Sequence, residues 1–224
     1  MLPTRAEIAT KPRATAPYSF AWHVALVHAG ALALLVPAVA LVREPSWTDL
    51  ATAPAGFLFA NLFEYLAHKH PMHHRVAIVG IAFDRHTMTH HAWFRPESMR
   101  VASNDEMKFV LFPWWAFLVM AALTSPVYLA VGLAAGRNAG LVMVAVATAY
   151  YLLYEWLHAI YRLAPPGPLA RIPVLGAAAA RHRLHHEPAR MTEVNFNITF
   201  PLFDHVFGTA RLPVTALGPP PAPP

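Results

Sequence analysis

Long apolar stretches alternate with polar segments along this chain of 224 residues. The apolar stretches are Phe20–Val42, Leu50–Ala67, Phe109–Val131, and a helix that starts near Leu141 and continues to about Arg162. Because a helix rises about 1.5 Å per residue, roughly 20 residues cross the hydrocarbon core of a bilayer, which is about 30 Å thick. The pattern predicts an all-α integral membrane protein with about four transmembrane helices.

The polar segments define the expected domain organisation. Residues 68–108 and 163–211 form two polar blocks outside the apolar stretches. Residues 1–18 are polar and broken by prolines, and residues 212–224 are rich in proline, so both are expected to be disordered tails. A single membrane domain should therefore cover residues 19–211.

Composition supports the membrane assignment. The chain is 56% hydrophobic and 13% charged, whereas soluble domains carry about 25% charged residues. The formal net charge of +5 comes from basic residues next to apolar runs, which favours membrane topology over nucleic-acid binding. The absence of cysteine excludes disulfides and thiolate metal sites.

Lysine and arginine are distributed unevenly between the two sides of the expected bundle. The N-terminal tail and both long polar segments are rich in them, whereas the two short links carry only Arg43 and Arg137. By the positive-inside rule, both termini and both polar segments are expected on the cytoplasmic side.

Histidine is concentrated in three places. The chain has 14 histidines, and eleven of them fall in these places. They are His68, His70, His73, His74, His86, His90 and His91 in the first polar segment, His158 in the fourth helix, and His182, His185 and His186 in the second polar segment. No packing requirement explains such clusters. Neutral imidazole is a ligand for iron, zinc, copper and nickel, so the clusters predict a polynuclear metal site on the cytoplasmic side.

Two clusters have helical spacing. His86 and His90 are four residues apart and would share one face of a helix, with His91 at its edge. His182 lies three and four residues before the next two histidines, again on one face. The spacing therefore predicts that each cluster directs its imidazoles toward a common centre.

The first cluster needs a bend. His68 and His73 are five residues apart, so on a straight α-helix their side chains would point in different directions. Pro71 lies between them, and proline ends or bends a helix. His70 and His74 are read as exposed residues or as residues that support the ligands.

Two glutamates accompany the histidines. Glu64 lies four residues before His68, so it is expected to accept a hydrogen bond from that imidazole. Glu155 precedes His158 in YEWLHAIYR and is a second candidate for a supporting role. For Glu64 direct ligation is the less favoured interpretation, and for Glu155 both a ligand role and a supporting role stay open.

In these histidine motifs the chain resembles the fatty acid hydroxylase/sterol desaturase superfamily of integral-membrane di-iron proteins. The resemblance runs from about Leu50 to Thr209 through HKHPMH, HTMTHH, YEWLHAIYR, HRLHH and the closing FPLFDHVFGT. It implies a four-helix membrane base, a cytosolic cap and two iron ions, with zinc possible by substitution. The implied ligands are His68, His73, His86, His90, His91, His158, His182, His185 and His186, and no catalytic residue or organic cofactor site is expected beyond them.

The chain departs from the family pattern at two points. Members often show H-x-x-H-H in the second motif, whereas one more residue intervenes here, a spacing that still gives one helical face. Members also often carry a histidine four residues after the one matching His158, and here that residue is Arg162. Because a cation cannot ligate a metal, we expect Arg162 to turn aside toward Glu155, Glu187 or Asp204 or the lipid headgroups, or His70 or His74 to fill the gap.

The resemblance implies an oxygenase that hydroxylates a C–H bond of a fatty-acyl-like lipid taken from the bilayer. The chain has no flavin, haem or iron–sulfur motif, so electrons would come from a separate cytochrome or ferredoxin-type donor. A lipid or sterol desaturase and a carotenoid hydroxylase of the same superfamily remain alternatives. A non-enzymatic membrane metal or haem protein, with His23 and His28 among its ligands, is a further alternative.

Overall fold

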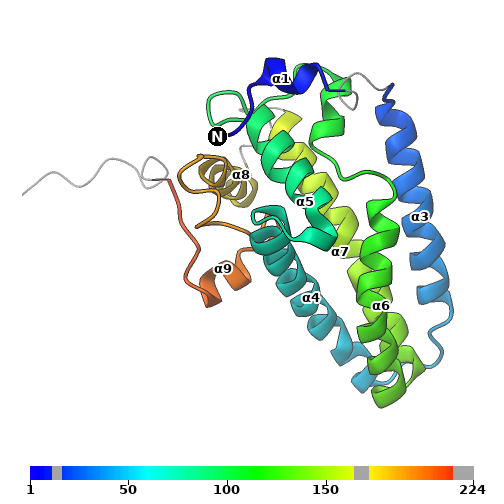
Figure 1. Ribbon diagram of the computed structural model, residues 1–224. Coiled ribbons are helices and arrows are strands. Elements are labelled where there is room, and N and C mark those ends of the chain that lie inside the picture. Colours follow the sequence, from blue (N-terminus) through cyan, green and yellow to red (C-terminus); the bar gives the residue numbers. More distant parts are fainter. Residues whose placement is uncertain (12–16, 164–171, 214–224) are drawn as a thin grey trace, which may run out of the picture. The chain divides into compact units, whose positions relative to one another are not determined.

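The computed structural model describes residues 1–11, 17–163 and 172–213 (Figure 1). Within these residues the secondary structure is helical, without a β-strand, so the predicted all-α class is confirmed. The proline-rich tail expected to be disordered falls almost entirely on residues 214–224, which lie outside the described residues.

The chain divides into two compact units. One, here called the membrane unit, consists of residues 18–62 and 104–156, and the other, the cap unit, consists of residues 1–17, 63–103 and 157–224. Two helices, α4 and α7, contribute residues to both units. All the clustered histidines belong to the cap unit.

Among the described residues, four helices are long and apolar enough to cross a membrane, as predicted: α3 Phe20–Ala40, α4 Trp47–Ala67, α6 Ala116–Ala135 and α7 Arg137–Leu163. The helix α4 continues without a break into the π-helical turn η1, His68–Met72. The residue before α3, Ser19, is its N-cap: the hydroxyl oxygen accepts a hydrogen bond from the backbone N–H of Trp22 at 3.3 Å.

The third spanning helix starts later than expected. The apolar pattern predicted a start at Phe109, but residues Asn104–Phe109 form a short 3-10 helix, η4, and α6 begins only at Ala116. Pro113 accounts for the difference, because proline lacks a backbone N–H and disfavours the helical conformation in the residue before it.

Small residues allow helices of the membrane unit to approach closely. A Cβ atom added to Gly140 of α7 would lie 2.9 Å from the Cα of Gly132 in α6 and 2.9 Å from the carbonyl oxygen of Tyr128. In the same unit α3 runs beside α6 (Figure 1), where a Cβ on Gly30 would meet the ring of Phe117 at 3.4 Å. Glycine at such contacts is typical of helix packing in membranes.

The cap unit is built from short helices around the ends of α4 and α7. They are α1 Arg5–Ala9, η1, the 3-10 turn η2 Ala77–Val79, α5 Gly80–Arg85, the π-helical turn η3 His86–His91, α8 Pro173–His185 and α9 Leu202–Val206. The presence of α1 differs from the disordered tail expected for residues 1–18. The Thr4 side chain caps α1, Ile8 is buried, and Arg5 donates from Nε to the carbonyl oxygen of Trp93 at 2.7 Å.

Candidate metal centre

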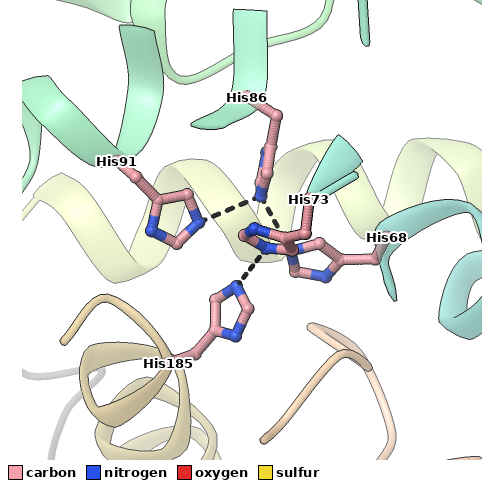
Figure 2. Close-up of side chains that lie close together, drawn as sticks. All are labelled: His68, His73, His86, His91 and His185. Carbon is pink, nitrogen blue, oxygen red and sulfur yellow. Dashed lines mark hydrogen bonds between the residues drawn. The ribbon is translucent and has the colours of Figure 1, made fainter. Parts of the chain in front are cut away.

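Five buried histidines come together in the cap unit, and we call them the first histidine group: His68, His73, His86, His91 and His185 (Figure 2). One nitrogen from each ring lies within 4.8 Å of the corresponding nitrogen of every other ring. The five residues come from η1 and the residue after it, from η3, and from the end of α8, so three separated stretches of sequence converge.

The π-helical turns set which histidines meet. In such a turn the hydrogen bonds run from residue i to i+5, so residues five apart stand one above the other. His68 and His73 have this spacing around η1, and His86 and His91 have it in η3. His86 and His90 do share one face, as expected, with stacked rings whose centroids lie 5.2 Å apart. Their ring nitrogens nevertheless serve different groups, because His86 and His91 belong to the first group and His90 to another.

The protons on these imidazoles are placed by acceptors around the group. His68 donates from Nδ1 to the carbonyl oxygen of Phe196 at 2.5 Å, and His185 donates from Nδ1 to that of Val194 at 2.7 Å. The hydroxyl of Thr87 donates to the carbonyl of Met72 at 2.6 Å, so its oxygen can accept from Nδ1 of His73 at 3.1 Å. Each of these three neutral rings then carries its lone pair on Nε2, the tautomer that metal-binding histidines adopt.

The Nε2 atoms face one another at short range. They are separated by 2.8 Å between His68 and His86, by 3.0 Å between His91 and His86, and by 3.0 Å between His73 and His185 (Figure 2). With the protons of His73 and His185 already on Nδ1, their contact brings two lone pairs together and requires a cation. Metal–imidazole bonds of about 2.1 Å at right angles place neighbouring nitrogens about 3 Å apart, so the first group fits a metal ion.

Burial keeps the rings neutral and able to bind. For His73, His86, His91 and His185, removal from water is the main cause that lowers the pKa well below the ordinary value, and neighbouring imidazoles lower it further. Because only a deprotonated ring nitrogen can bind a metal, these four residues are suited to ligation at neutral pH.

A second histidine group consists of His90, His182 and His186, all buried, with His158 beside them. The Nε2 atom of His90 lies 3.2 Å from that of His186 and 3.1 Å from that of His158. His186 donates from Nδ1 to the carbonyl oxygen of Phe94 at 2.5 Å, so its Nε2 lone pair also faces the centre of the group. The nine histidines proposed as ligands thus lie together, divided into two groups.

Arg162 lies in the second histidine group, so the expectation that it turns aside is wrong. Its Nη2 atom is 2.5 Å from Nε2 of His186, 2.7 Å from Nε2 of His182 and 3.0 Å from Nε2 of His90. After burial itself, this positive charge is the largest cause that holds the pKa of His182 and His186 well below the ordinary value.

The carboxylates proposed as partners of Arg162 have other partners. Glu155 accepts from the backbone N–H of Phe112 and the hydroxyl of Tyr151, and Glu187 forms an exposed ion pair with Arg190. Asp204 accepts from backbone N–H groups of its own neighbourhood. Glu155 is also outside both histidine groups, so no supporting contact with an imidazole is seen for it.

Glu64 supports the site in a different way from the one expected. Its carboxylate accepts from the backbone N–H groups of Ile198 and Thr199 and from the Thr199 hydroxyl, the last at 2.6 Å. The Nδ1 proton of His68 goes to Phe196. The glutamate therefore holds the backbone next to the carbonyl that orients His68.

Asp204 is a supporting residue that sequence reasoning missed. It is fully buried, and its two oxygens accept from the backbone N–H groups of Phe196 at 2.9 Å and of Asn197 at 2.8 Å. Its position inside the closing motif FPLFDHVFGT was the available signal. The backbone acceptors at Phe94, Val194 and Phe196 carried no such signal, because every residue has a carbonyl group.

The remaining histidines are not members of either group. His70 and His74 are exposed and neither fills the position of Arg162. In the membrane unit His28 donates from Nδ1 to the carbonyl of Val24 at 2.8 Å and accepts at Nε2 from the indole N–H of Trp156 at 3.0 Å. Both ring nitrogens of His28 are thus engaged, which disfavours the haem alternative.

The fold and site define a class: an integral membrane protein whose described residues form four candidate spanning helices and two buried groups of histidines that could hold a metal ion. Residues 53–209 match the family described as "Fatty acid hydroxylase", and the chain belongs to this family. Comparison with curated proteins and with solved structures gives no match. The match confirms the superfamily indicated by the histidine motifs and covers both histidine groups.

Proposed function

We propose that the protein is an iron-dependent membrane hydroxylase that converts a C–H bond of a fatty-acyl-like lipid into an alcohol. The observation that carries the proposal is the first histidine group, in which buried neutral rings direct their Nε2 lone pairs at one another. Membership in the fatty acid hydroxylase family supports the reaction class. Zinc could take the place of iron in the purified protein, because imidazole accepts both metals.

The proposed reaction is R–H + O₂ + 2 e⁻ + 2 H⁺ → R–OH + H₂O. Bound iron would supply the activation of O₂, which no side chain of the two groups can perform. The residues of the chain hold three of the proposed ligands, His185, His68 and His73, in one tautomer, through the carbonyls of Val194 and Phe196 and the hydroxyl of Thr87. They also keep water out, since every histidine of both groups is buried.

The reaction needs two partners besides O₂, an electron donor and a lipid substrate. The two electrons are proposed to come from a separate cytochrome or ferredoxin-type protein, because the sequence has no flavin, haem or iron–sulfur motif. The lipid is proposed to enter from the bilayer, and the asymmetry of lysine and arginine favours a cytoplasmic location for the histidine groups.

Lipid extracts from cells grown under ¹⁸O₂ test this function. Cells that express the native chain should contain a lipid heavier by one ¹⁸O atom, and cells that express His185→Ala should lack it. His74→Ala is the matched control, since His74 is exposed and lies outside both groups. A product lighter by two hydrogens would assign a desaturase instead, and no change in any lipid class would reject both reactions.

A further inference from the structure

The second histidine group already contains a cation, the guanidinium of Arg162. Nη2 lies 2.5 to 3.0 Å from the Nε2 atoms of three histidines, His90, His182 and His186. These are distances of charge-assisted hydrogen bonds. Arginine stays protonated in proteins and can only donate. Because Nη2 carries two N–H groups, it can donate to two of these three ring nitrogens at a time, or share one N–H between two of them.

A metal ion and this guanidinium would compete for the same Nε2 lone pairs. The Nε2 atom of a neutral imidazole has one lone pair, which either accepts an N–H or binds a metal. For His186 the Nδ1 proton is held by the carbonyl of Phe94, so the lone pair is on Nε2 and faces Nη2 at 2.5 Å. An ion about 2.1 Å from the same nitrogens would also overlap Nη2 in space.

Arg162 is held in this position from several sides. The side chain is fully buried, with a relative exposure of 0%. Its Nη1 lies 2.9 Å from the sulfur of Met99, and its guanidinium carbon lies 4.8 Å from the centre of the Phe94 ring, a cation–π contact. Its backbone carbonyl accepts from the N–H of Val101 at 3.2 Å. A snorkelling interface residue would instead extend its charged end to water.

We propose that the protein binds one metal ion per chain, in the first histidine group, and that Arg162 supplies the permanent cation of the second. The two groups then have different tasks. The first group has facing lone pairs with no side-chain cation among its members, so it needs a metal ion between them. In the second group the guanidinium of Arg162 is that cation. The inference rests on the metal-binding part of the proposed function and does not depend on the reaction.

Metal counting on the full-length chain in detergent tests the proposal. The chain is equilibrated with excess Zn²⁺ or, without oxygen, Fe²⁺, then desalted, and metal per chain is measured by mass spectrometry. The native chain should retain about one ion. Arg162→His and Arg162→Gln should each retain about two, because both remove the fixed charge and free the lone pairs. Arg190→His, at an exposed arginine paired with Glu187, is the matched control and should stay at one.

His185→Ala, made alone and together with Arg162→Gln, shows which group holds each ion. His185→Ala should bring the native background to about zero and the Arg162→Gln background to about one. Two ions in the native chain would overturn the inference and leave the proposed function intact. One ion in a folded Arg162→Gln chain would also overturn it, since the guanidinium would then not be what excludes the second ion. No retained ion in either chain would reject the proposed metal-dependent function itself.

Discussion

The carboxylate of Asp204 and the backbone of Phe196 form one continuous support for a histidine of the first group. Asp204 accepts the N–H of Phe196 at 2.9 Å, and the carbonyl oxygen of Phe196 accepts the Nδ1–H of His68 at 2.5 Å. A residue outside both histidine groups thus helps to hold the carbonyl that orients His68.

Asp204→Asn should weaken metal binding without removing a ligand. The amide cannot accept from both backbone N–H groups, so the Phe196 carbonyl would be held less firmly. Loss of outer partners of metal ligands typically lowers affinity 10- to 100-fold, and an effect through the backbone should be about 10-fold. Zn²⁺ titration against a competing chelator measures it. Asp84→Asn, at an exposed aspartate paired with Arg75, should leave affinity unchanged, and equal affinities for all three chains would contradict this role.

Thr87→Val should weaken metal binding by removing a direct contact to a proposed ligand, His73. Valine keeps the shape of threonine but removes the oxygen that accepts from Nδ1 of His73, so the ring loses its fixed tautomer. We expect metal affinity to fall roughly 10- to 100-fold while the far-ultraviolet circular dichroism stays the same. Thr89→Val provides the comparison, since that hydroxyl donates to the carbonyl of Asp84. An unaltered affinity in Thr87→Val would show that the hydroxyl does not orient His73.

The metal-free chain should lose stability as the pH falls below about 6.5, the ordinary pKa of histidine in an unfolded chain. Burial holds the folded-state pKa of His73, His86, His91, His182, His185 and His186 below that value. The unfolded chain therefore binds more protons, and stability rises with pH through this window.

Each neutral buried histidine contributes up to about 1.4 kcal/mol per pH unit to this slope. Thermal unfolding of the metal-free chain in detergent at pH 7.5, 6.5 and 5.5 measures it, with a progressive fall in melting temperature expected. His74→Gln should show the same fall, because His74 is exposed. A melting temperature that does not change between pH 7.5 and 5.5 would contradict neutral burial of these rings.

Single-cysteine labelling should place the polar segments in the cytoplasm. The native chain has no cysteine, so each introduced thiol is the sole target. A membrane-impermeant maleimide added to intact cells should label Pro45→Cys, in the short link that holds Arg43, and should not label Glu97→Cys, in the first polar segment. Both positions are exposed, and permeabilised cells should show labelling of both. Labelling of residue 97 alone in intact cells would reverse the topology.

The sequence by itself determined the class of the protein. Spanning helices follow from runs of apolar residues, which need no partner to be recognised. The start of α6 lies later than the apolar run because Pro113 disfavours a helix in the residue before it. The candidate ligands followed from residue type, since eleven clustered histidines have no structural use in a core. The family, too, was readable from the motifs, and the match over residues 53–209 confirms it.

The tertiary structure decided how those residues are used. The assignment of His91 to the first group and His90 to the second depends on the π-helical turn η3, and a spacing counted on an α-helix cannot reveal it. The carbonyls that fix the tautomers come from the backbone at Phe94, Val194 and Phe196, where any residue would offer the same acceptor. The direction of Arg162 depends on the converging lone pairs of histidines up to 72 positions away in sequence. An arginine alone suggests a charge that avoids a histidine cluster, and only the packed cap shows its guanidinium among three histidine rings.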